Sequence, residues 1–455
     1  MKKLLVIVSI ALAAALLLPV AALAFSADVL DNPTYDYTQN GFIYKEASAN
    51  VNGAQKLFYA EYNSTQTDSE YEWVIHSIRN GTQTTRSTVM QIANDYENTT
   101  GRKVMFAANG DYFDNTGANM ESYVNNGIVI SKGSFITKHC IGFDNNGKVA
   151  LGRMTEVEKR LVVYVDGQPH FFEIDKFNQQ PAEGEIAVYD KAGSYTVTDA
   201  GVLTVKTDSV NMSMYPVFGT DYTMTATGVQ QEKSFRLNSG QFAVVYTSTH
   251  NDLLSTHAYG EEVSLVEIPA GDFLGCTWVL GGYDMLVNNF TVNTDCHDDN
   301  DGDGAAPRTL IGIKEDGTTF VCVLDGRQGS YAKGVTVEQE AQLAGVLGAK
   351  YALELDGGGS STAIVRIDDV LTLRNKPSDR SMRAVSNAIL LVEKEQQSVT
   401  PDPDNPNEPD PDEPSEPQQP ADPSIPTGDI IAIAVCAVVV IACTTVAIVL
   451  IRKKR

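Results

Sequence analysis

Three strongly apolar segments of this chain each end in a polar residue followed by glycine, and this pattern constrains the fold more than any other feature. Apolar runs of this length predict buried β-strands. Strand ends are also where a rigid scaffold presents functional side chains. We therefore expect a body rich in strands, with its chemistry at strand ends. In chain order, the segments are 104–108 before Asn109-Gly110, 320–324 before Asp325-Gly326, and 351–355 before Asp356-Gly357.

Two segments have helical periodicity. Residues 87–100 place an apolar face every three to four positions and end before Gly101. Residues 337–347 follow Thr336, and Gln339 completes a capping box. Because the second helix lies between two apolar strands, the chain contains a βαβ-like unit, and the predicted class is α+β (mixed α/β) with few helices. Further strands are predicted at 161–165, 186–189, 241–247, 263–268 and 277–280.

The two ends of the chain predict an exported, membrane-anchored protein. The start has two lysines, an apolar run and a small-x-small cleavage site, which is typical of a signal peptide. An uncharged segment near the end is long enough to span a membrane, and the basic tail after it predicts a cytoplasmic C-terminus. The predicted parts are a signal peptide at 1–24, the N-terminal part of the body at 25–102, a catalytic domain at 103–392, a stalk at 393–429, a transmembrane helix at 430–451 and a tail at 452–455.

The stalk holds 10 of the 18 prolines and has no hydrophobic period, so it predicts an extended spacer. Residues 424–429 resemble a cell-wall sorting signal, but no residue separates Pro426 from Thr427. Two locations therefore stay open: the extracellular face of the cell membrane, through the C-terminal helix, and the cell wall.

The balance of acidic and basic residues limits which partners the protein can bind. Acidic residues outnumber basic ones 58 to 34, giving a formal net charge of −24. A surface this acidic excludes nucleic acid as the main partner, because phosphate backbones need a basic surface. Four cysteines lie outside the predicted membrane segment, and both disulfides and free buried thiols are compatible with them: Cys140, Cys276, Cys296 and Cys322.

An ordered set of motifs between about residues 103 and 392 resembles the phosphodiester glycosidase family. Its most specific parts are Arg308-Thr309 and the run Asp356-Gly357-Gly358-Gly359-Ser360. Residues 155–275 match only loosely, and substrate selection is expected there. The matching segments are 108–113, 280–287, 307–312, 324–327, 347–349 with 355–362, and 383–388.

The resemblance implies hydrolysis of a sugar-1-phosphodiester into free sugar and a phosphate monoester. Glycosidic cleavage typically uses two carboxyls, and the first candidates are Asp356 and Asp111, followed by Asp325 and Glu354. Because two positions separate Glu354 from Asp356, an extended strand would place both on one face. Substrate binding is assigned to arginines that bind phosphate bidentately, to backbone amides and to neighbouring polar groups. These residues are Asn109, Gly110, Arg308, Thr309, Arg327, Gly357, Gly358, Gly359, Ser360, Arg383 and Asn387.

No cofactor is required by this chemistry. Residues 295–304 are acidic, and Asp299, Asp301 and Asp303 match the first half of a calcium loop. The twelfth position of that loop is Leu310 rather than glutamate. A Ca²⁺ site and a flexible acidic loop both remain open.

Three functions fit the sequence. The first is a surface-tethered phosphodiester glycosidase that acts on a sugar phosphodiester or glycan. The second is a carbohydrate-binding surface protein without activity. The third is a phosphodiesterase that breaks the P–O bond of wall polymers. The intact arginine and Asp-Gly motifs favour an enzyme.

Overall fold

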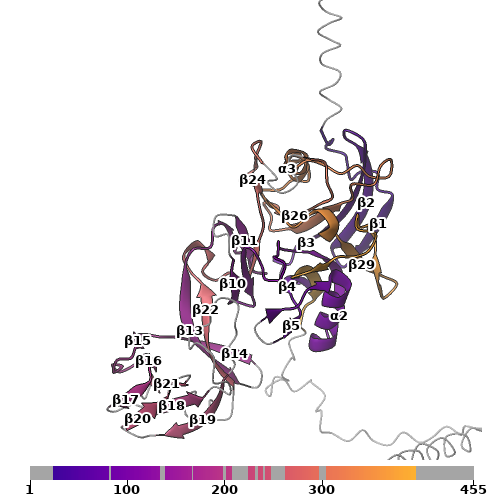
Figure 1. Cartoon of the computed structure of the whole chain (residues 1–455). Helices are drawn as coiled ribbons and strands as arrows, with labels where there is room; N and C mark the ends of the chain where they lie inside the picture. Colours follow the sequence, from indigo (N-terminus) through magenta and orange to yellow (C-terminus); the bar gives the residue numbers. More distant parts are fainter. Residues whose placement is uncertain are drawn as a thin grey trace, which may run out of the picture. The chain divides into compact units, whose positions relative to one another are not determined.

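The structure is a computed structural model that divides into two units, Met1–Glu395 and Gln396–Arg455. All described residues belong to the first unit (Figure 1). They are 24–80, 83–133, 139–165, 168–197, 201–206, 224–230, 234–238, 241–246, 262–296 and 304–395.

The largest sheet of the body joins the start of the chain to its later part. It has eight strands in the order β1-β2-β3-β27-β26-β28-β24-β25, and neighbouring strands are antiparallel. The strands are β1 (Tyr35–Gln39), β2 (Phe42–Asn50), β3 (Ala54–Tyr62), β27 (Thr319–Leu324), β26 (Arg308–Ile313), β28 (Tyr351–Glu354), β24 (Met285–Asn288) and β25 (Thr291–Val292).

The predicted strand–helix–strand unit is present in this sheet. α3 (Val337–Val346) connects β27 to β28, and β26 lies between the two strands. Because β26 is antiparallel to both, β27 and β28 run parallel to each other. The connection is therefore a split βαβ crossover.

A second sheet faces the first across a shared hydrophobic core. Tyr44 and Phe58 from the first sheet and Phe106 and Leu390 from the second belong to one buried cluster. α2 (Val89–Thr100) packs against β8 and β32 of the second sheet. Its order is β30 (Val370–Leu373), β29 (Ala363–Ile367), β8 (Val104–Asn109), β32 (Ala388–Glu393) and β4 (Tyr71–His76).

A third sheet carries a long insertion. We call residues 157–269 the inserted unit, because they lie between the fourth and fifth strands of this sheet in chain order, β12 and β23. The third sheet has the order β10 (Ile128–Lys132), β9 (Ser122–Asn125), β23 (Trp278–Gly281), β11 (Cys140–Phe143) and β12 (Val149–Gly152).

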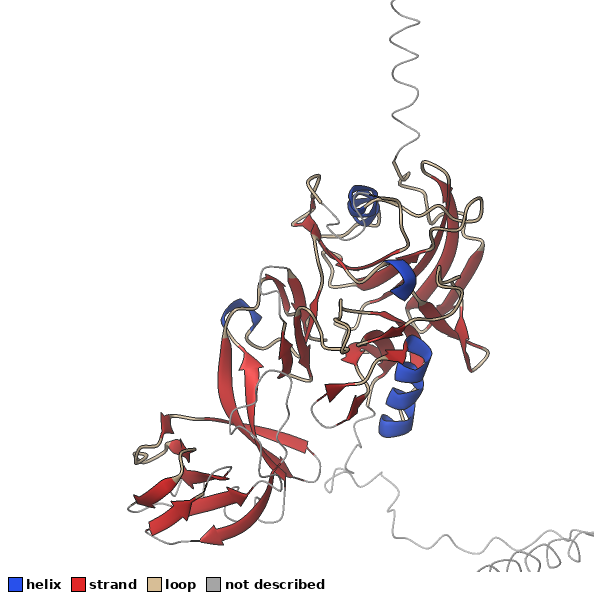
Figure 2. Ribbon diagram, in the orientation of Figure 1, coloured by secondary structure: helices blue, strands red, loops and turns tan. Residues whose placement is uncertain are grey.

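The inserted unit is built from strands (Figure 2). Its sheet has the order β14 (Gln168–Glu173), β13 (Val157–Val165), β22 (Glu262–Pro269), β19 (Met224–Gln230), β18 (Gly201–Lys206), β21 (Gln241–Tyr246), β16 (Ile186–Tyr189) and β15 (Lys176–Phe177). A separate two-stranded antiparallel sheet pairs β17 (Gly193–Thr196) with β20 (Ser234–Leu237). The remaining short elements are β5 (Arg79–Asn80) with β6 (Gln83–Thr84), β7 (Ser87–Thr88) with β31 (Ala384–Val385), and the 3₁₀ turns η3 (Gly271–Phe273) and η4 (Gly358–Ser360).

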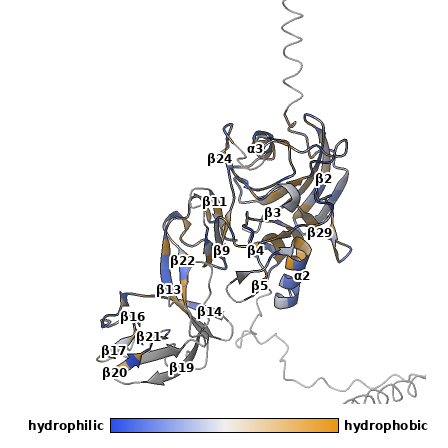
Figure 3. Cartoon of the chain, in the orientation of Figure 1, coloured by the Kyte–Doolittle hydropathy of each residue, from blue (hydrophilic) through white to orange (hydrophobic). Residues whose placement is uncertain are grey.

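Both predicted helices form, with the predicted caps. Thr88 and Gln91 make a capping box at α2, and Thr336 and Gln339 make one at α3. α2 begins at Val89 because the two preceding residues pair with β31 as a short strand. It ends at Gly101, which has a left-handed backbone. Figure 3 shows both hydrophobic and hydrophilic positions along α2, as expected for a helix with one buried face.

The described part of the chain confirms a strand-rich body with two α-helices. Its four cysteines are free and buried, so the free-thiol alternative is correct. No helix in the described ranges is long and apolar enough to cross a membrane. The predicted signal peptide up to residue 23, the membrane span and the tail lie outside those ranges, as does the stalk beyond Glu395, and they stay predictions.

Candidate active site

The polar ends of β8 and β28 and the start of β26 meet at one place. Asp356 donates its backbone N–H to Gly110 O at 3.1 Å, and Leu355 donates to Thr309 O at 2.8 Å. Asn109 Nδ2 donates to Asp356 O at 2.5 Å. The predicted residues around Asp111, Arg308 and Asp356 are therefore brought together by the fold.

The buried side chain of Asn109 connects the segments that meet at this junction through hydrogen bonds. It is fully buried, and its Oδ1 accepts a hydrogen bond from the Thr362 backbone N–H at 3.0 Å. The same oxygen lies 3.0 Å from Thr309 Oγ1, which in turn lies 3.2 Å from Ser361 Oγ. Asn109 and Thr309 were predicted to bind substrate, but the structure places both side chains in this buried network.

The glycine run forms a tight loop, in which a side chain at Gly357 would meet backbone and one at Gly359 would displace neighbouring side chains. A Cβ on Gly357 would lie 2.9 Å from Pro307 O, and a Cβ on Gly359 would lie 2.1 Å from Arg383 Nη2. Gly358 has a left-handed backbone with φ of 60° and donates its N–H to Pro307 O at 2.9 Å. The amide of Gly358 is therefore used within the loop.

Two arginines lie against this loop. Arg327 is exposed, and its Nη1 is the atom nearest to the Cβ position of Gly358, at 3.1 Å. Arg383 is about two-fifths exposed and forms an ion pair of 2.8 Å with Asp379. Its Nη1 lies 3.5 Å from the hydroxyl of the buried Ser360. The loop thus carries two guanidinium groups at its surface.

Arg308 has a different environment from the other two arginines. It is 1% exposed and forms a 2.9 Å ion pair with Glu354, which is equally buried. It also donates hydrogen bonds to Val335 O at 3.3 Å and to Gly304 O at 3.2 Å. The sequence predicted a phosphate ligand and a catalytic carboxyl here, whereas the structure pairs the two with each other.

The four predicted carboxyls differ sharply in exposure. Asp111, Asp325 and Glu354 are each 1% exposed, while Asp356 is partly exposed. The expected alternation that would put Glu354 and Asp356 on one face does not extend to Asp356, because β28 ends at Glu354 and the next residues belong to the loop. Asp356 is the carboxyl of this set that solvent reaches.

The Asp325 carboxyl binds the segment at Asn375 and Lys376 and does not face the surface of the glycine loop. It accepts hydrogen bonds from Asn375 Nδ2 at 3.0 Å, from the Lys376 backbone N–H and from the Tyr331 hydroxyl at 3.2 Å. Burial raises its pKa to about 6, against the opposing effect of these donors.

Asp111 is buried beneath the junction. Its backbone N–H donates to Asn387 Oδ1 at 2.9 Å, and its Oδ2 accepts from Asn119 Nδ2 at 3.0 Å. Its Oδ1 has no hydrogen-bond partner, nor has Asn387 Nδ2. Burial raises the pKa of Asp111 well above its usual range, and the nearby Glu121 and Asp356 carboxyls add to the shift.

Sequence reasoning missed three residues at this place. Glu121 is 4% exposed, and its Cβ lies only 2.0 Å from the position that a Cβ on Gly281 would take. Tyr112 and Tyr283 are partly exposed, and their ring centroids are 5.8 Å apart. The glycines before Tyr283 were an available signal, because a Cβ on Gly282 would lie 2.2 Å from Glu354 O. Glu121 offers no such local signal.

The predicted calcium residues Asp299, Asp301 and Asp303 lie outside the described residues, and the calcium site stays a prediction. Within the described ranges, no group of three His, Cys, Asp or Glu side chains is placed to hold a metal ion.

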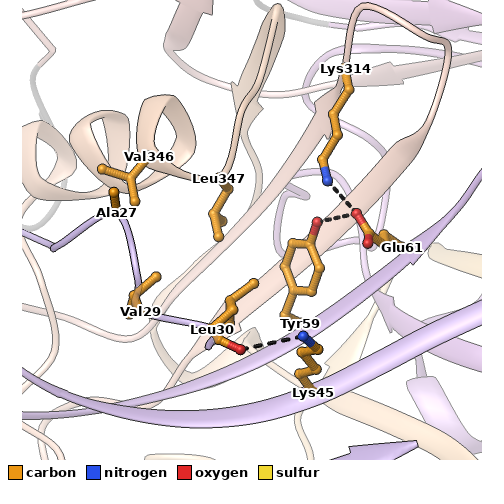
Figure 4. A pocket seen from close by; sticks show the side chains of 9 residues that line it. All are labelled: Ala27, Val29, Leu30, Lys45, Tyr59, Glu61, Lys314, Val346 and Leu347. Carbon is orange, nitrogen blue, oxygen red and sulfur yellow. Dashed lines mark hydrogen bonds and ion pairs between the residues drawn. The ribbon is translucent and has the colours of Figure 1, made fainter. Parts of the chain in front are cut away.

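A separate cavity of about 130 Å³ lies between the N-terminal segment, β3 and the end of α3 (Figure 4). Its polar wall is internally paired, since Glu61 contacts both the Tyr59 hydroxyl and Lys314 Nζ. None of the predicted site residues lines this cavity.

The family model described as phosphodiester glycosidase matches residues 192–392. The predicted family resemblance is therefore confirmed for these residues. The matched range contains Arg308, Asp325, Arg327, Asp356 and Arg383, and it begins after the Asn109–Asp111 segment.

Three solved structures are similar to the chain. A hypothetical protein from Synechocystis has 17% sequence identity and a TM-score of 0.46; the match covers 78% of this chain but only 62% of that protein. A putative exported protein from Burkholderia pseudomallei has 16% identity and a TM-score of 0.40, with 75% of each chain covered.

The third is the catalytic domain of zebrafish N-acetylglucosamine-1-phosphodiester alpha-N-acetylglucosaminidase, auto-inhibited by its pro-peptide. It has 14% identity and a TM-score of 0.38, with 80% of this chain and 87% of that chain covered. No curated protein matches the chain.

Proposed function

We propose that this protein hydrolyses a sugar-1-phosphodiester to free sugar and a phosphate monoester, with Asp356 as the reacting carboxylate. The observation that carries the proposal is the contrast among the four predicted carboxyls. Asp356 is partly exposed beside the glycine loop, and the other three are 1% exposed and engaged in hydrogen bonds.

The phosphate group binds at the glycine loop in this proposal. Arg327 and Arg383 lie against Gly358 and Gly359, and guanidinium groups bind phosphate oxygens through paired, charge-assisted hydrogen bonds. Arg383 is already paired with Asp379 at 2.8 Å, so Arg327 supplies the main positive charge for a diester with one negative charge, and the acidic composition of the chain does not oppose this substrate.

The sugar lies against Tyr112 and Tyr283. Their rings are tilted by 54° and are partly exposed on segments that directly adjoin the junction. Aromatic rings with an exposed face supply apolar contact area for a sugar, and the Tyr112 hydroxyl is held by Glu354, with its oxygen 3.5 Å from Glu354 Oε1. Tyr283 is held in place because its backbone N–H donates to Glu354 O at 3.0 Å.

In the reaction, the bond between the sugar C1 and the phosphate oxygen breaks, and the oxygen of water becomes the new hydroxyl at C1. Asp356 either takes the proton from that water or first forms a covalent bond to C1 that water then hydrolyses. A phosphate monoester is a good leaving group, so one carboxylate at the surface of the site is sufficient. The Arg308–Glu354 pair holds β26 and β28 in register under the reacting group.

Product analysis in oxygen-18 water tests this function. The purified chain is incubated with a sugar-1-phosphodiester, and the products are separated and weighed by mass spectrometry. Label in the free sugar is the expected result, because it requires cleavage of the C–O bond. Label in the phosphate would instead establish phosphodiesterase activity. Binding without turnover would establish a carbohydrate-binding protein.

We also propose that the enzyme works outside the cell, anchored by residues 430–451, and this part rests on the sequence alone. Labelling of intact cells with a membrane-impermeant biotin reagent is the test. We expect the full-length protein to be labelled on intact cells. Labelling that occurs only after the cells are lysed would refute the location.

A further inference from the structure

The segments that form the candidate site follow one another along one end of the largest sheet. Tyr283 precedes β24, Asp356 follows β28 and Arg327 follows β27, while Lys56 lies near the start of β3, the strand next to β27. The antiparallel register brings the starts of β24 and β3 to the same end of the sheet as the ends of β28 and β27. Because neighbouring strands are about 4.8 Å apart, this series extends from Tyr283 across Asp356 and Arg327 to Lys56.

Two lysine side chains reach the same aromatic ring at the β3 side of the series. Lys376 Nζ lies 4.9 Å and Lys56 Nζ 5.8 Å from the centroid of the Tyr331 ring. Both distances are in the range of a cation–π contact. Tyr331 lies in the turn that begins at Arg327, whose backbone N–H donates to Lys333 O at 3.0 Å. We call Lys56, Lys376 and Tyr331 the lysine cluster.

Hydrogen bonds connect the lysine cluster to the glycine loop. Asn375, the residue before Lys376, donates from Nδ2 to Ser361 O at 2.9 Å, at the end of the loop. The Asp325 carboxyl accepts hydrogen bonds from the Lys376 backbone N–H at 3.0 Å and from the Tyr331 hydroxyl at 3.2 Å. The cluster is therefore attached to the same scaffold that holds the loop.

The positive charge of the cluster is not taken up by carboxylates within the part of the chain that the structure describes. Neither lysine forms an ion pair there, and Lys56 Nζ donates to a serine hydroxyl at 2.8 Å. Burial raises the pKa of the Tyr331 hydroxyl to about 12, and the nearby Asp325 and Glu46 carboxyls add to the shift. Both acids are engaged elsewhere, because Asp325 is 1% exposed and accepts several hydrogen bonds, and Glu46 pairs with Arg374 at 2.5 Å. An anion is the ligand that such a surface favours.

We propose that the lysine cluster is a subsite for a second phosphate group, carried by the leaving group of the substrate. The proposal deepens the proposed function, on which the identity of the leaving group rests. With the sugar at Tyr283 and the scissile phosphate at Arg327, the rest of the substrate continues toward Lys56 and Lys376. A phosphate there accepts charge-assisted hydrogen bonds from both ammonium groups and relieves their mutual repulsion.

The substrate class is accordingly a sugar-1-phosphodiester whose leaving group is itself phosphorylated. Two sources have this chemistry: a sugar diphosphate, in which the two phosphates share an oxygen, and a polymer in which a polyol or sugar unit separates them. The bond that breaks is still the one between the sugar C1 and the phosphate oxygen, and water still supplies the new hydroxyl at C1. The leaving product then carries both phosphates.

Paired substrates test the subsite through turnover. The first substrate is a sugar-1-phosphodiester of glycerol, and the second has an additional phosphate on the far hydroxyl of the glycerol. The double variant Lys56→Gln, Lys376→Gln should lower the ratio of kcat/KM for the second substrate to that for the first by about tenfold or more, because charge-assisted hydrogen bonds are lost.

The matched control for turnover is Lys350→Gln. Lys350 Nζ also lies over an aromatic ring, 5.7 Å from the centroid of Tyr351, but at the opposite end of β28 from the site. This variant should leave the ratio unchanged. An unchanged ratio in the double variant, with circular dichroism that matches the unsubstituted chain, would overturn the proposal.

Isothermal titration calorimetry of the full chain tests the subsite without turnover. The probes are inorganic phosphate, pyrophosphate and glycerol bisphosphate. At least one of the two probes with two phosphates should bind more tightly than inorganic phosphate, and the double variant should lose about tenfold of that affinity. A preference for pyrophosphate would indicate a diphosphate leaving group, and a preference for glycerol bisphosphate would indicate a polymer.

The two measurements separate the subsite from the proposed function. Equal affinities of the unsubstituted chain and the double variant, or no binding of either probe with two phosphates, would refute the subsite even if the enzyme hydrolyses a sugar-1-phosphodiester. Loss of affinity in the double variant of a chain that hydrolyses no such substrate would refute only the proposed function.

Discussion

In both the body and the inserted unit, a polar residue follows a buried strand. The two regions differ in the residue that comes next and in the packing around the polar side chain. In the body, glycines follow Asn109, Asp325 and Asp356, and a Cβ on any of these glycines would lie within 2.9 Å of a neighbouring segment. In the inserted unit, Asp190 follows the buried strand β16 but is followed by Lys191.

The packing around these acids differs accordingly. The body gathers many buried polar side chains at its strand ends. In the inserted unit, Asp190 is the only buried polar or charged side chain among the residues whose exposure is described, and Asn178 satisfies one of its oxygens. The glycine after a strand-end residue lets another segment approach closely, and at Asn109 and Asp356 this approach builds the junction of the candidate site.

The largest expected effect separates the two acids directly. Asp356→Asn should lower kcat/KM by about 10³-fold or more, because it removes the reacting carboxylate. Asp190→Asn should leave turnover within about twofold, since Asp190 is only 2% exposed and its carboxyl binds Asn178. Both are measured by steady-state kinetics with matched circular dichroism. Equal losses in the two variants would remove the distinction between the regions.

The second effect concerns buried ion pairs. Arg308→Met leaves Glu354 as an uncompensated charge at 1% exposure and should lower the free energy of unfolding by about 3–5 kcal/mol. Adding Glu354→Leu should recover much of this loss. The matched variant Lys132→Met breaks the more exposed 2.8 Å pair with Glu267 of the inserted unit and should cost about 1 kcal/mol or less. Urea unfolding gives all three values, and equal costs for the two single variants would contradict the comparison.

The third effect is a pH dependence of stability. Burial raises the pKa of Asp325 to about 6, from a usual value of 3.8. Because the folded state holds this proton more tightly, the stabilising contribution is complete below about pH 4 and is lost as pH rises through about 6. The loss is roughly 1.4 kcal/mol per pH unit in that window. Unfolding free energies of the unsubstituted chain and Asp325→Asn should therefore differ by more at pH 4 than at pH 7, and parallel curves would show that Asp325 does not titrate there.

The smallest effect concerns phosphate binding. Arg327→Ala should raise KM by about 10- to 100-fold with a smaller change in kcat, because it removes charge-assisted hydrogen bonds to a phosphate oxygen. Arg236→Ala, on an exposed position of β20 in the inserted unit, is the comparison, and an unchanged KM would confine phosphate binding to the glycine loop. A rise in KM for Arg236→Ala instead would place substrate contacts in the inserted unit.

Local elements were largely predictable because their signals are local. The capping boxes at Thr88 and Thr336 use residues three positions apart, and Gly101 ends α2 with the backbone that glycine adopts readily. The strand at 186–189 was predicted with its observed bounds because it is a short apolar run between turn signals. The start of α2 was placed two residues early, because Ser87–Thr88 pair with a strand almost 300 residues later.

Local patterns along the chain were enough to locate the strand ends and their glycines, and to find motifs that resemble those of phosphodiester glycosidases. The exposure of each acid and the identity of its partners came from packing between distant segments. Glu354 meets Arg308 across 46 positions, and Asp111 meets Asn387 across 276. Alternation along a strand tells which face a side chain takes but not what covers that face, so burial, pairing and proton affinity depend on segments far away in the chain.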